Sequence, residues 1–386
     1  MLFLIAIFLL LVIIFVILVF ATQSDPVADV IRNEQIIKIL FVLEDEHHEA
    51  IFTTVLGYYP RLRRGVLYDI PGNTGAIYAS LGRVDRIDAV YREQGIEPYR
   101  LEIERLLGQE VPFSVVITID AFVQLADYLG GLRVFVPSPI DAVSEHGERW
   151  LLPSGAVTLD GDKVRTYLSY TTEEDSLADI QERKQNTMLA VLSAFSENET
   201  LLFSKKAFRS LAPLFNANIS SDDLRRLFEV VAQIDAERII TTTIIGSSRV
   251  VDGQTLLFPL YDGQLFKDSV KQTLSSLLST SDTALNRVYV LEIQNGTMVQ
   301  GLAHNTSTLL QGAGYDVLTT RNAERMDIEH TVIIDHIGNR EASESLGNFI
   351  NCTNIVADEI SDVSDSDFQV DFTIILGSDF DGRYVR

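Results

Sequence analysis

The first twenty residues constrain the chain more than any other segment. From Leu2 to Phe20 they form nineteen consecutive apolar residues without a charge, a glycine or a proline. About 20 such residues are what a helix needs to cross the hydrocarbon core of a bilayer. A cleaved signal peptide is the alternative, because Val19-Phe20-Ala21 loosely fits a small-residue cleavage site. Signal peptides carry a basic stretch before a shorter apolar region, and that basic stretch is absent here. We therefore predict a transmembrane anchor over residues 1–21, which enters the lipid bilayer with residues 2–20, and a polar tether over residues 22–35.

The charge of the chain limits its possible partners, and its cysteine content limits its disulfides. Of its 386 residues, 54 are Asp or Glu and 31 are Lys or Arg, which gives a net charge of −23. Such a surface repels the phosphates of nucleic acids, so no nucleic-acid partner is expected. Cys352 is the one cysteine of the sequence, so no disulfide can form within the chain.

Short β-branched runs alternate with helical patterns along the rest of the chain. Before residue 275 we predict strands at 36–43, 50–56, 64–70, 115–119, 132–136 and 238–245, and helices at 121–129 and from near 175 to 195. The polar segment 275–286 marks a domain boundary. After it we predict strands at 288–293, 315–319, 331–335, 353–357 and 370–376 and helices at 299–311 and 340–350. The pattern predicts an α/β (α+β) fold with a first domain over 36–278, a linker over 279–287 and a smaller α/β domain over 288–383.

Several motifs of the first domain, taken in order, resemble the LytR–CpsA–Psr family. Asp69-Ile70-Pro71-Gly72-Asn73-Thr74 lies where that family has Ser-Ile-Pro-Arg-Asp-Thr, and Arg86-Ile87-Asp88-Ala89-Val90-Tyr91 is similar to its Lys-Ile-Asn-Ala-x-Tyr segment. Leu159-Asp160-Gly161 matches its Leu-Asp-Gly box, and Arg183-Lys184-Gln185 its Arg-Gln-Gln. The residues from Val290 to Phe380 resemble the LytR C-terminal module. The order and spacing of these motifs, together with the anchor and the tail, carry the resemblance.

The resemblance implies a place and an activity. It implies a single-pass protein of the cytoplasmic membrane whose bulk lies outside the cytoplasm, with a mixed sheet flanked by helices. It also implies the transfer of a glycopolymer from a polyprenyl-pyrophosphate carrier to peptidoglycan. In such a site arginines bind the phosphate oxygens and carboxylates hold Mg²⁺. The expected partners are therefore a polyprenyl-linked glycan or peptidoglycan, and the expected cofactor of an active enzyme is Mg²⁺.

Five positions depart from the family pattern, and all five are positions at which the family has a phosphate-binding arginine or a metal-binding carboxylate. The family's arginine and aspartate are Gly72 and Asn73, two further arginines are replaced by Ser169 and Thr171, and the first arginine of Arg-x-x-Arg is Ile180. Four of five phosphate-binding arginines are thus absent. A hydrogen bond to a charged group contributes about 1.5–3 kcal/mol, so four losses remove roughly 6 kcal/mol or more, about four decades of affinity. The sequence therefore favours a non-catalytic binding or scaffold protein of the envelope.

Two alternatives remain open. In the first, the chain is an active Mg²⁺-dependent transferase with a relocated site. Arg183 and Arg86 would then be catalytic, Arg165 and Gln185 would bind substrate, and Glu49 would bind the metal. The less specific interpretation of these arginines is solvated surface charge, and that of the run 44–49 is a polar loop. In the second alternative, the chain is a surface adhesin or assembly partner that acts through residues 288–383.

Overall fold

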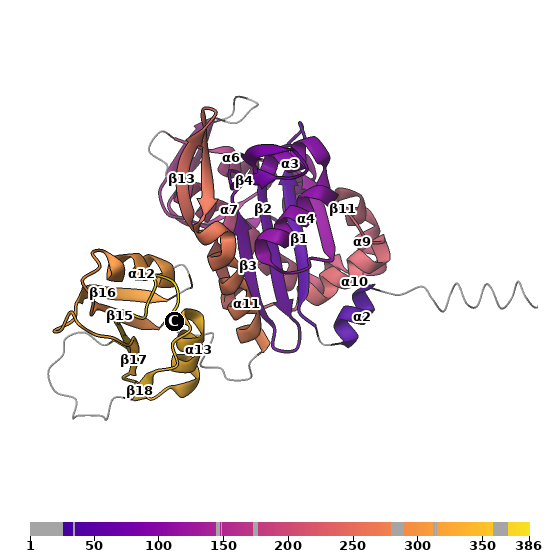
Figure 1. Cartoon of the computed structure of the whole chain (residues 1–386). Helices are drawn as coiled ribbons and strands as arrows, with labels where there is room; N and C mark the ends of the chain where they lie inside the picture. The colour runs from indigo at the N-terminus through magenta and orange to yellow at the C-terminus, as the bar shows by residue number, and fades with distance from the viewer. Residues whose placement is uncertain are drawn as a thin grey trace, which may run out of the picture.

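The computed structural model of the chain describes residues 26–33, 35–143, 147, 149–172, 177–278, 289–311, 313, 315–357 and 370–386. They form two domains, each with a β-sheet and helices (Figure 1). The predicted anchor, residues 1–21, lies outside the described residues. Among the residues that are described, no helix has the length and apolar character needed to cross a membrane.

The first domain is built on a mixed sheet. In the described part of the chain this sheet has six strands in the order β11-β6-β1-β2-β3-β12. Their bounds are Ile37–Glu44 (β1), Ala50–Tyr59 (β2), Arg64–Ile70 (β3), Phe113–Thr118 (β6), Asn216–Ala217 (β11) and Ile239–Thr243 (β12). Strands β1, β2 and β3 pair antiparallel, whereas β6 runs parallel to β1 and β12 runs parallel to β3. The predicted mixed sheet is confirmed, and its long strands begin and end within a few residues of their predicted bounds.

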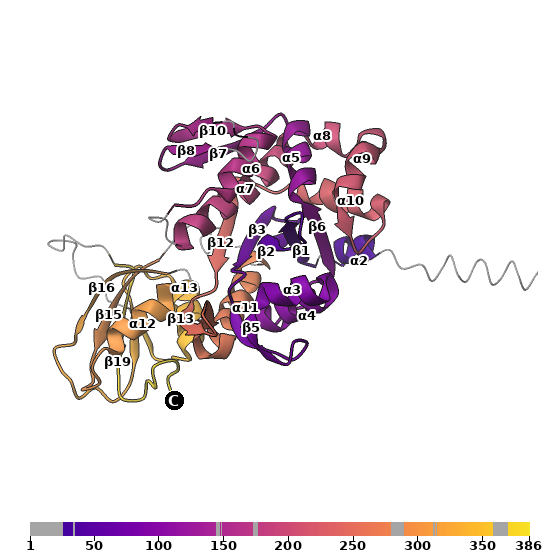
Figure 2. The same ribbon diagram turned by 90° about the horizontal axis from the view of Figure 1, so that it is seen from above.

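Helices cover both faces of this sheet (Figure 2). One layer contains α3 (Ile87–Gln94), α4 (Ile96–Leu107) and α11 (Gln264–Leu278). The other contains α5 (Ile119–Tyr128), α6 (Gly161–Ser169), α7 (Leu177–Glu197), α8 (Glu199–Leu202), α9 (Lys205–Leu211) and α10 (Ser221–Val231). Successive side chains of a strand point to opposite faces. Accordingly, Ile39 of β1 is buried in the core under α5–α10, and the next residue, Leu40, in the core under α3, α4 and α11.

Four two-stranded sheets accompany the main sheet in the described residues. They pair β4 (Gly75–Tyr78) with β5 (Arg83–Arg86), β7 (Leu132–Val136) with β10 (Gly155–Leu159), β8 (Ile140–Val143) with β9 (Arg149–Leu152), and β13 (Gly246–Val251) with β14 (Gln254–Pro259). The segment predicted to be a polar tether contains α2 (Pro26–Arg32), and its Val27 is buried in the core that α10 also contributes to. The second half of the tether is therefore part of the folded domain.

The second domain has a sheet in the order β16-β15-β19-β17-β18. Its elements are β15 (Val290–Asn295), α12 (Leu302–Gln311), β16 (Asp316–Asn322), β17 (Val332–Asp335), α13 (Arg340–Ile350), β18 (Ile355–Ala357) and β19 (Phe372–Leu376). It rests on α11 of the first domain. There Leu265 joins the core of the second domain, and Asp268 accepts hydrogen bonds from Arg383 Nη2 and from the Tyr384 hydroxyl, each at 2.7 Å.

Candidate functional site

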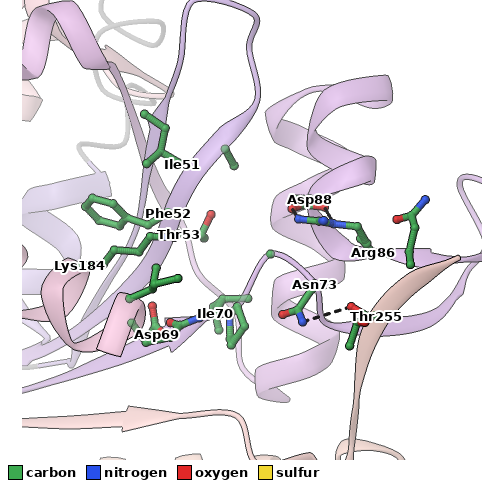
Figure 3. Close-up of a pocket in the computed structure, with 16 residues that line it drawn as sticks. Ile51, Phe52, Thr53, Asp69, Ile70, Asn73, Arg86, Asp88, Lys184 and Thr255 are labelled. Carbon is green, nitrogen blue, oxygen red and sulfur yellow. Dashed lines mark hydrogen bonds and ion pairs between the residues drawn. The ribbon is translucent and has the colours of Figure 1, made fainter. Parts of the chain in front are cut away.

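A pocket of about 380 Å³ opens where β3 ends and the antiparallel β2 begins. Five parts of the chain line it: the start of β2, the end of β3 with the loop after it, the start of α3, the first turns of α7, and the start of β14. The lining residues are Ala50, Ile51, Phe52, Thr53, Asp69, Ile70, Pro71, Gly72, Asn73, Arg86, Asp88, Ile180, Gln181, Lys184, Gln254 and Thr255. Figure 3 shows Asp69 and Lys184 on one side of the pocket and the Arg86–Asp88 pair on the other.

Asp69 is a buried carboxylic acid at the end of β3, with only 3% of its surface exposed. All seven residues of β3 are buried, because helices cover both faces of this interior strand. Thr243 Oγ1 on the neighbouring β12 donates to Asp69 Oδ2 at 3.3 Å. The side-chain amide of Gln181 also donates to Asp69 when its nitrogen faces the carboxyl group. Burial raises the pKa of Asp69 to about 7, and the Lys184 ammonium and the Thr243 hydrogen bond offset only part of this rise.

Lys184 is the cation that α7 presents to the pocket. Successive helical residues are rotated by about 100°, so Ile180, Gln181 and Lys184 fall on one face of α7, and all three line the pocket. Burial lowers the pKa of Lys184, and the charge of Asp69 partly opposes this effect. Within the described residues, the Lys184 ammonium forms no hydrogen bond or ion pair. A half-buried ammonium without a partner is costly, so this group is suited to receiving one from outside the chain.

Arg86 faces a partner within the pocket. Its Nε donates to Asp88 Oδ1 at 2.8 Å and its Nη2 to Asp88 Oδ2, which makes the pair bidentate. Gly72 packs against the same carboxylate: a Cβ at Gly72 would overlap Asp88 Oδ2 and would lie 3.1 Å from its Cγ. The volume next to the backbone where the family has an arginine is therefore taken by Asp88.

The loop after β3 is held firmly in this position. Thr74 donates from both its backbone N and its Oγ1 to Pro71 O, and it accepts from the backbone N of Ile87 at 2.8 Å. Asn73 is joined to β14, because its backbone O accepts from Leu257 N at 2.9 Å and its Nδ2 donates to Thr255 O at 3.4 Å. These hydrogen bonds hold the loop in the position in which Gly72 and Asn73 line the pocket.

Of the predicted functional residues, only Arg86 lines the pocket, together with the departures Gly72, Asn73 and Ile180. The other predicted residues make different contacts. Arg183 donates to Tyr170 O at 2.7 Å and lies over the Tyr170 ring, Arg165 pairs with Asp120, and Glu49 faces Arg92 at 3.5 Å. Ser169 donates back to Arg165 O at 2.8 Å, and Thr171 is exposed. Gln185, next to Lys184, does not line the pocket either.

The sequence interpretation overlooked Asp69, Asp88, Gln181 and Lys184. A signal for Lys184 was present, because it follows Ile180 by four residues on a predicted helix and so shares its face. The run 44–49 also differs from a simple polar loop. Glu44 is buried at the end of β1, where its Oε2 accepts from the Tyr91 hydroxyl at 2.6 Å and lies 3.1 Å from His48 Nδ1.

The pocket fits a magnesium ion poorly. Mg²⁺ prefers carboxylate oxygens that are free to complete an octahedral shell. Both oxygens of Asp88 face Arg86, Asp69 is buried next to an ammonium, and position 73 carries an amide. Nor do the described residues hold a group of three or more His, Cys, Asp or Glu side chains arranged to bind a metal.

Comparison with models of protein families assigns each of the two domains to a family. Residues 62–272 match the model of the LytR_cpsA_psr family, and residues 288–380 match that of the LytR cell envelope-related transcriptional attenuator. The chain belongs to the LytR–CpsA–Psr family. It is a cell-envelope protein with a LytR C-terminal domain, as its motifs led us to expect.

Solved structures share the fold of this LytR–CpsA–Psr domain at low sequence identity. TagV of B. subtilis is 19% identical over 64% of this chain and 98% of its own, with a TM-score of 0.55. The protein gbs0355 of Streptococcus agalactiae is 17% identical over 66% of this chain and 91% of its own, also with a TM-score of 0.55. TagT bound to LIIa-WTA is 17% identical over 63% and 91%, with a TM-score of 0.52. No curated protein matches the chain.

Proposed function

We propose that the chain is a LytR–CpsA–Psr protein that binds an envelope glycan but does not transfer it. In this proposal residues 2–20 anchor it in the cytoplasmic membrane, and the domains lie outside the cytoplasm. The TagT structure carries LIIa-WTA, and the family resemblance implies a polyprenyl-linked glycan. A glycan ligand of the cell envelope is therefore the expected partner.

One observation carries this proposal. Asp88 fills the space next to Gly72 and holds Arg86 in a bidentate pair, so an arginine of the family site is missing and the nearest remaining arginine is neutralised. Pyrophosphate carries several negative charges and needs guanidinium or metal partners that are free to bind it. A pocket whose arginine already faces a carboxylate provides little of that stabilisation for a developing charge.

The active alternative with a relocated site has less support. It needs Arg86, Arg165, Arg183 and Glu49 to converge, yet of these only Arg86 lines the pocket. The others contact Asp120, Tyr170 and Arg92, none of which lines the pocket. A transferase would have to move these side chains when substrate binds.

Transfer by the full-length chain in detergent micelles tests the proposal. The assay supplies a labelled polyprenyl-pyrophosphate glycopolymer, peptidoglycan and Mg²⁺, and a family member that keeps the arginines is the positive control. We expect no label on peptidoglycan above the level of a protein-free reaction. Transfer by this chain that disappears in Arg183→Ala would overturn the proposal and establish the relocated site.

A further inference from the structure

The pocket contains two cations and two carboxylic acids, but only one of the cations forms an ion pair with a carboxylate of the described residues. Arg86 is held by both oxygens of Asp88. Lys184, in contrast, has no hydrogen bond or ion pair with any described residue. The remaining acid, Asp69, already accepts from Thr243 on β12 and faces Gln181 on α7. One positive charge of the pocket is therefore open to a ligand.

The protonation of Asp69 makes the net charge of the pocket more positive. Burial raises its pKa to about 7, so near neutrality a substantial fraction of Asp69 is uncharged and does not neutralise Lys184. The other charged groups of the pocket are Arg86 and Asp88 of the opposite wall, and their charges cancel. At neutral pH the pocket thus carries up to one net positive charge.

The remaining lining is polar but uncharged, with apolar side chains between. Asn73 and Thr255 contribute amide and hydroxyl groups, and Gln254 stands beside Thr255 on β14. Such groups suit the hydroxyls of a sugar or polyol, because each can donate and accept hydrogen bonds. Ile51, Phe52 and Ile70 add apolar surface. A pocket of about 380 Å³ has room for a group the size of a sugar and its anionic substituent.

We infer that this pocket is a site for a singly charged anionic group on a hydroxyl-rich unit, held by Lys184. The group is a phosphodiester or a carboxylate, since both present one negative charge to one ammonium. The inference rests on the proposed function and specifies it: the pocket recognises a repeating unit of an envelope polymer and not the pyrophosphate of its lipid carrier. A pyrophosphate would leave at least one negative charge unmatched beside Asp88.

Calorimetric titration of the full-length chain in detergent micelles tests this inference. The probes are bis-glycerol phosphodiester, glucuronate, glycerol and inorganic pyrophosphate, each near pH 6.5, where Asp69 is mostly protonated. We expect one of the two monoanions to bind more tightly than glycerol and pyrophosphate. The probe that binds identifies the source of the charge as a phosphodiester or a carboxylate.

Two variants assign the binding to the ammonium. Lys184→Gln is expected to weaken monoanion binding about tenfold or more. The matched control is Lys163→Gln, whose ammonium on α6 pairs with Asp160 and lies over the Trp150 ring, outside the pocket. The control should bind like the unaltered chain. Equal affinity of Lys184→Gln and the unaltered chain, binding of neither monoanion, or tighter binding of glycerol or pyrophosphate would each overturn the inference.

If Lys184→Gln does not fold, a third variant, Asp69→Asn, still tests the inference. Near pH 8 Asp69 is ionised and opposes an incoming anion, so Asp69→Asn should bind the monoanion about tenfold more tightly than the unaltered chain at that pH. No gain would contradict the role of Lys184. The transfer assay is separate: transfer would refute the non-transferring function, whereas failure to bind monoanions would refute only this ligand class.

Discussion

At the scale of single residues, Gly72 and Asp88 define how this pocket differs from a phosphate clamp. The glycine lies where a side chain would meet the Asp88 carboxylate, and the φ of Gly72 is one that other residues also adopt. A glycine is therefore required here by the close contact with Asp88 and not by the backbone conformation. Restoring an arginine at this position would require Asp88 to move and Arg86 to lose its partner.

Replacement of Gly72 by alanine tests this packing. The added Cβ overlaps Asp88 Oδ2, and overpacking of this kind costs about 1–3 kcal/mol of unfolding free energy. Urea denaturation measures it. In Asp88→Ala the overlapping oxygen is gone, so Gly72→Ala should cost less in that background, with a coupling of about 0.5–3 kcal/mol. If Gly72→Ala is as stable as the unaltered chain, the packing argument is wrong.

Asp69 makes stability depend on pH. Its pKa is raised from 3.8 to about 7 in the folded chain, so between these values the folded state binds more protons than the unfolded state. Stability is therefore highest below about pH 4 as far as Asp69 is concerned, and it falls as the pH rises towards 7. The full loss is on the order of 2–4 kcal/mol.

Asp69→Asn removes this dependence, because an amide does not ionise. Urea denaturation near pH 5 and near pH 8 should give the unaltered chain a larger drop in unfolding free energy than the variant. The charged and polar groups around the carboxyl, Lys184, Gln181 and Thr243, are the same in both proteins. An identical drop in the two proteins would mean that Asp69 titrates normally.

At the scale of elements, six phenylalanine rings join β1, α7, α9, α10 and the segments between them. Phe228 of α10 has ring neighbours in Phe41, Phe195, Phe203, Phe208 and Phe215, with centroids 5.1–6.4 Å away. Phe228 itself is 1% exposed. This cluster fastens the helical layer behind the pocket to the central sheet.

Truncation of Phe228 should therefore loosen that layer. Phe228→Ala is expected to lower the unfolding free energy by about 3–5 kcal/mol, through lost burial and the cavity it leaves. Leu201→Ala on the nearby α8, whose side chain is 67% exposed, is the control and should change it by less than about 0.5 kcal/mol. Thermal or urea denaturation compares them. A small effect of Phe228→Ala would show that the layer is held elsewhere.

The elements also show what the sequence could and could not predict. Runs such as Ile37–Leu43 are β-branched and apolar, so central strands could be located, whereas hairpins such as β8–β9 are short and half exposed and were missed. Within α7, the family pattern drew attention to Arg183. A rotation of about 100° per residue turns its neighbour Lys184 towards the pocket instead. Asp69, whose charge acts on Lys184, lies on a different element, and no local pattern connects the two.

At the scale of the whole molecule, α11 joins the two domains. Its Phe266 and Val270 are buried in the first domain, while Asp268 and Gln272 bond to the second. Arg383, 6% exposed, lies over the rings of Phe349 and Tyr384 and donates to Asp268. The last residues of the described chain thus hold the second domain against the first.

Loss of this contact should release the second domain. Arg383→Ala leaves Asp268 without its cation and removes two ring contacts, for an expected loss of about 2–4 kcal/mol in the stability of the docked arrangement. Faster cleavage of the chain by a protease measures it. The exposed Arg386, which pairs with Asp381 at 3.0 Å, supplies the control, because Arg386→Ala should cost less than about 1 kcal/mol. Equal cleavage rates in the two variants would argue against a docking role for Arg383.

Binding of a polyprenyl-pyrophosphate to the full-length chain in detergent micelles, with and without Mg²⁺, tests whether the pocket has lost the phosphate site of its family. Because Asp88 neutralises Arg86 and fills the space at Gly72, we expect no saturable binding up to about 1 mM. Mg²⁺-dependent binding in the micromolar range that is lost in Arg183→Ala would contradict it, and would mean that the pocket keeps the ligand of its family.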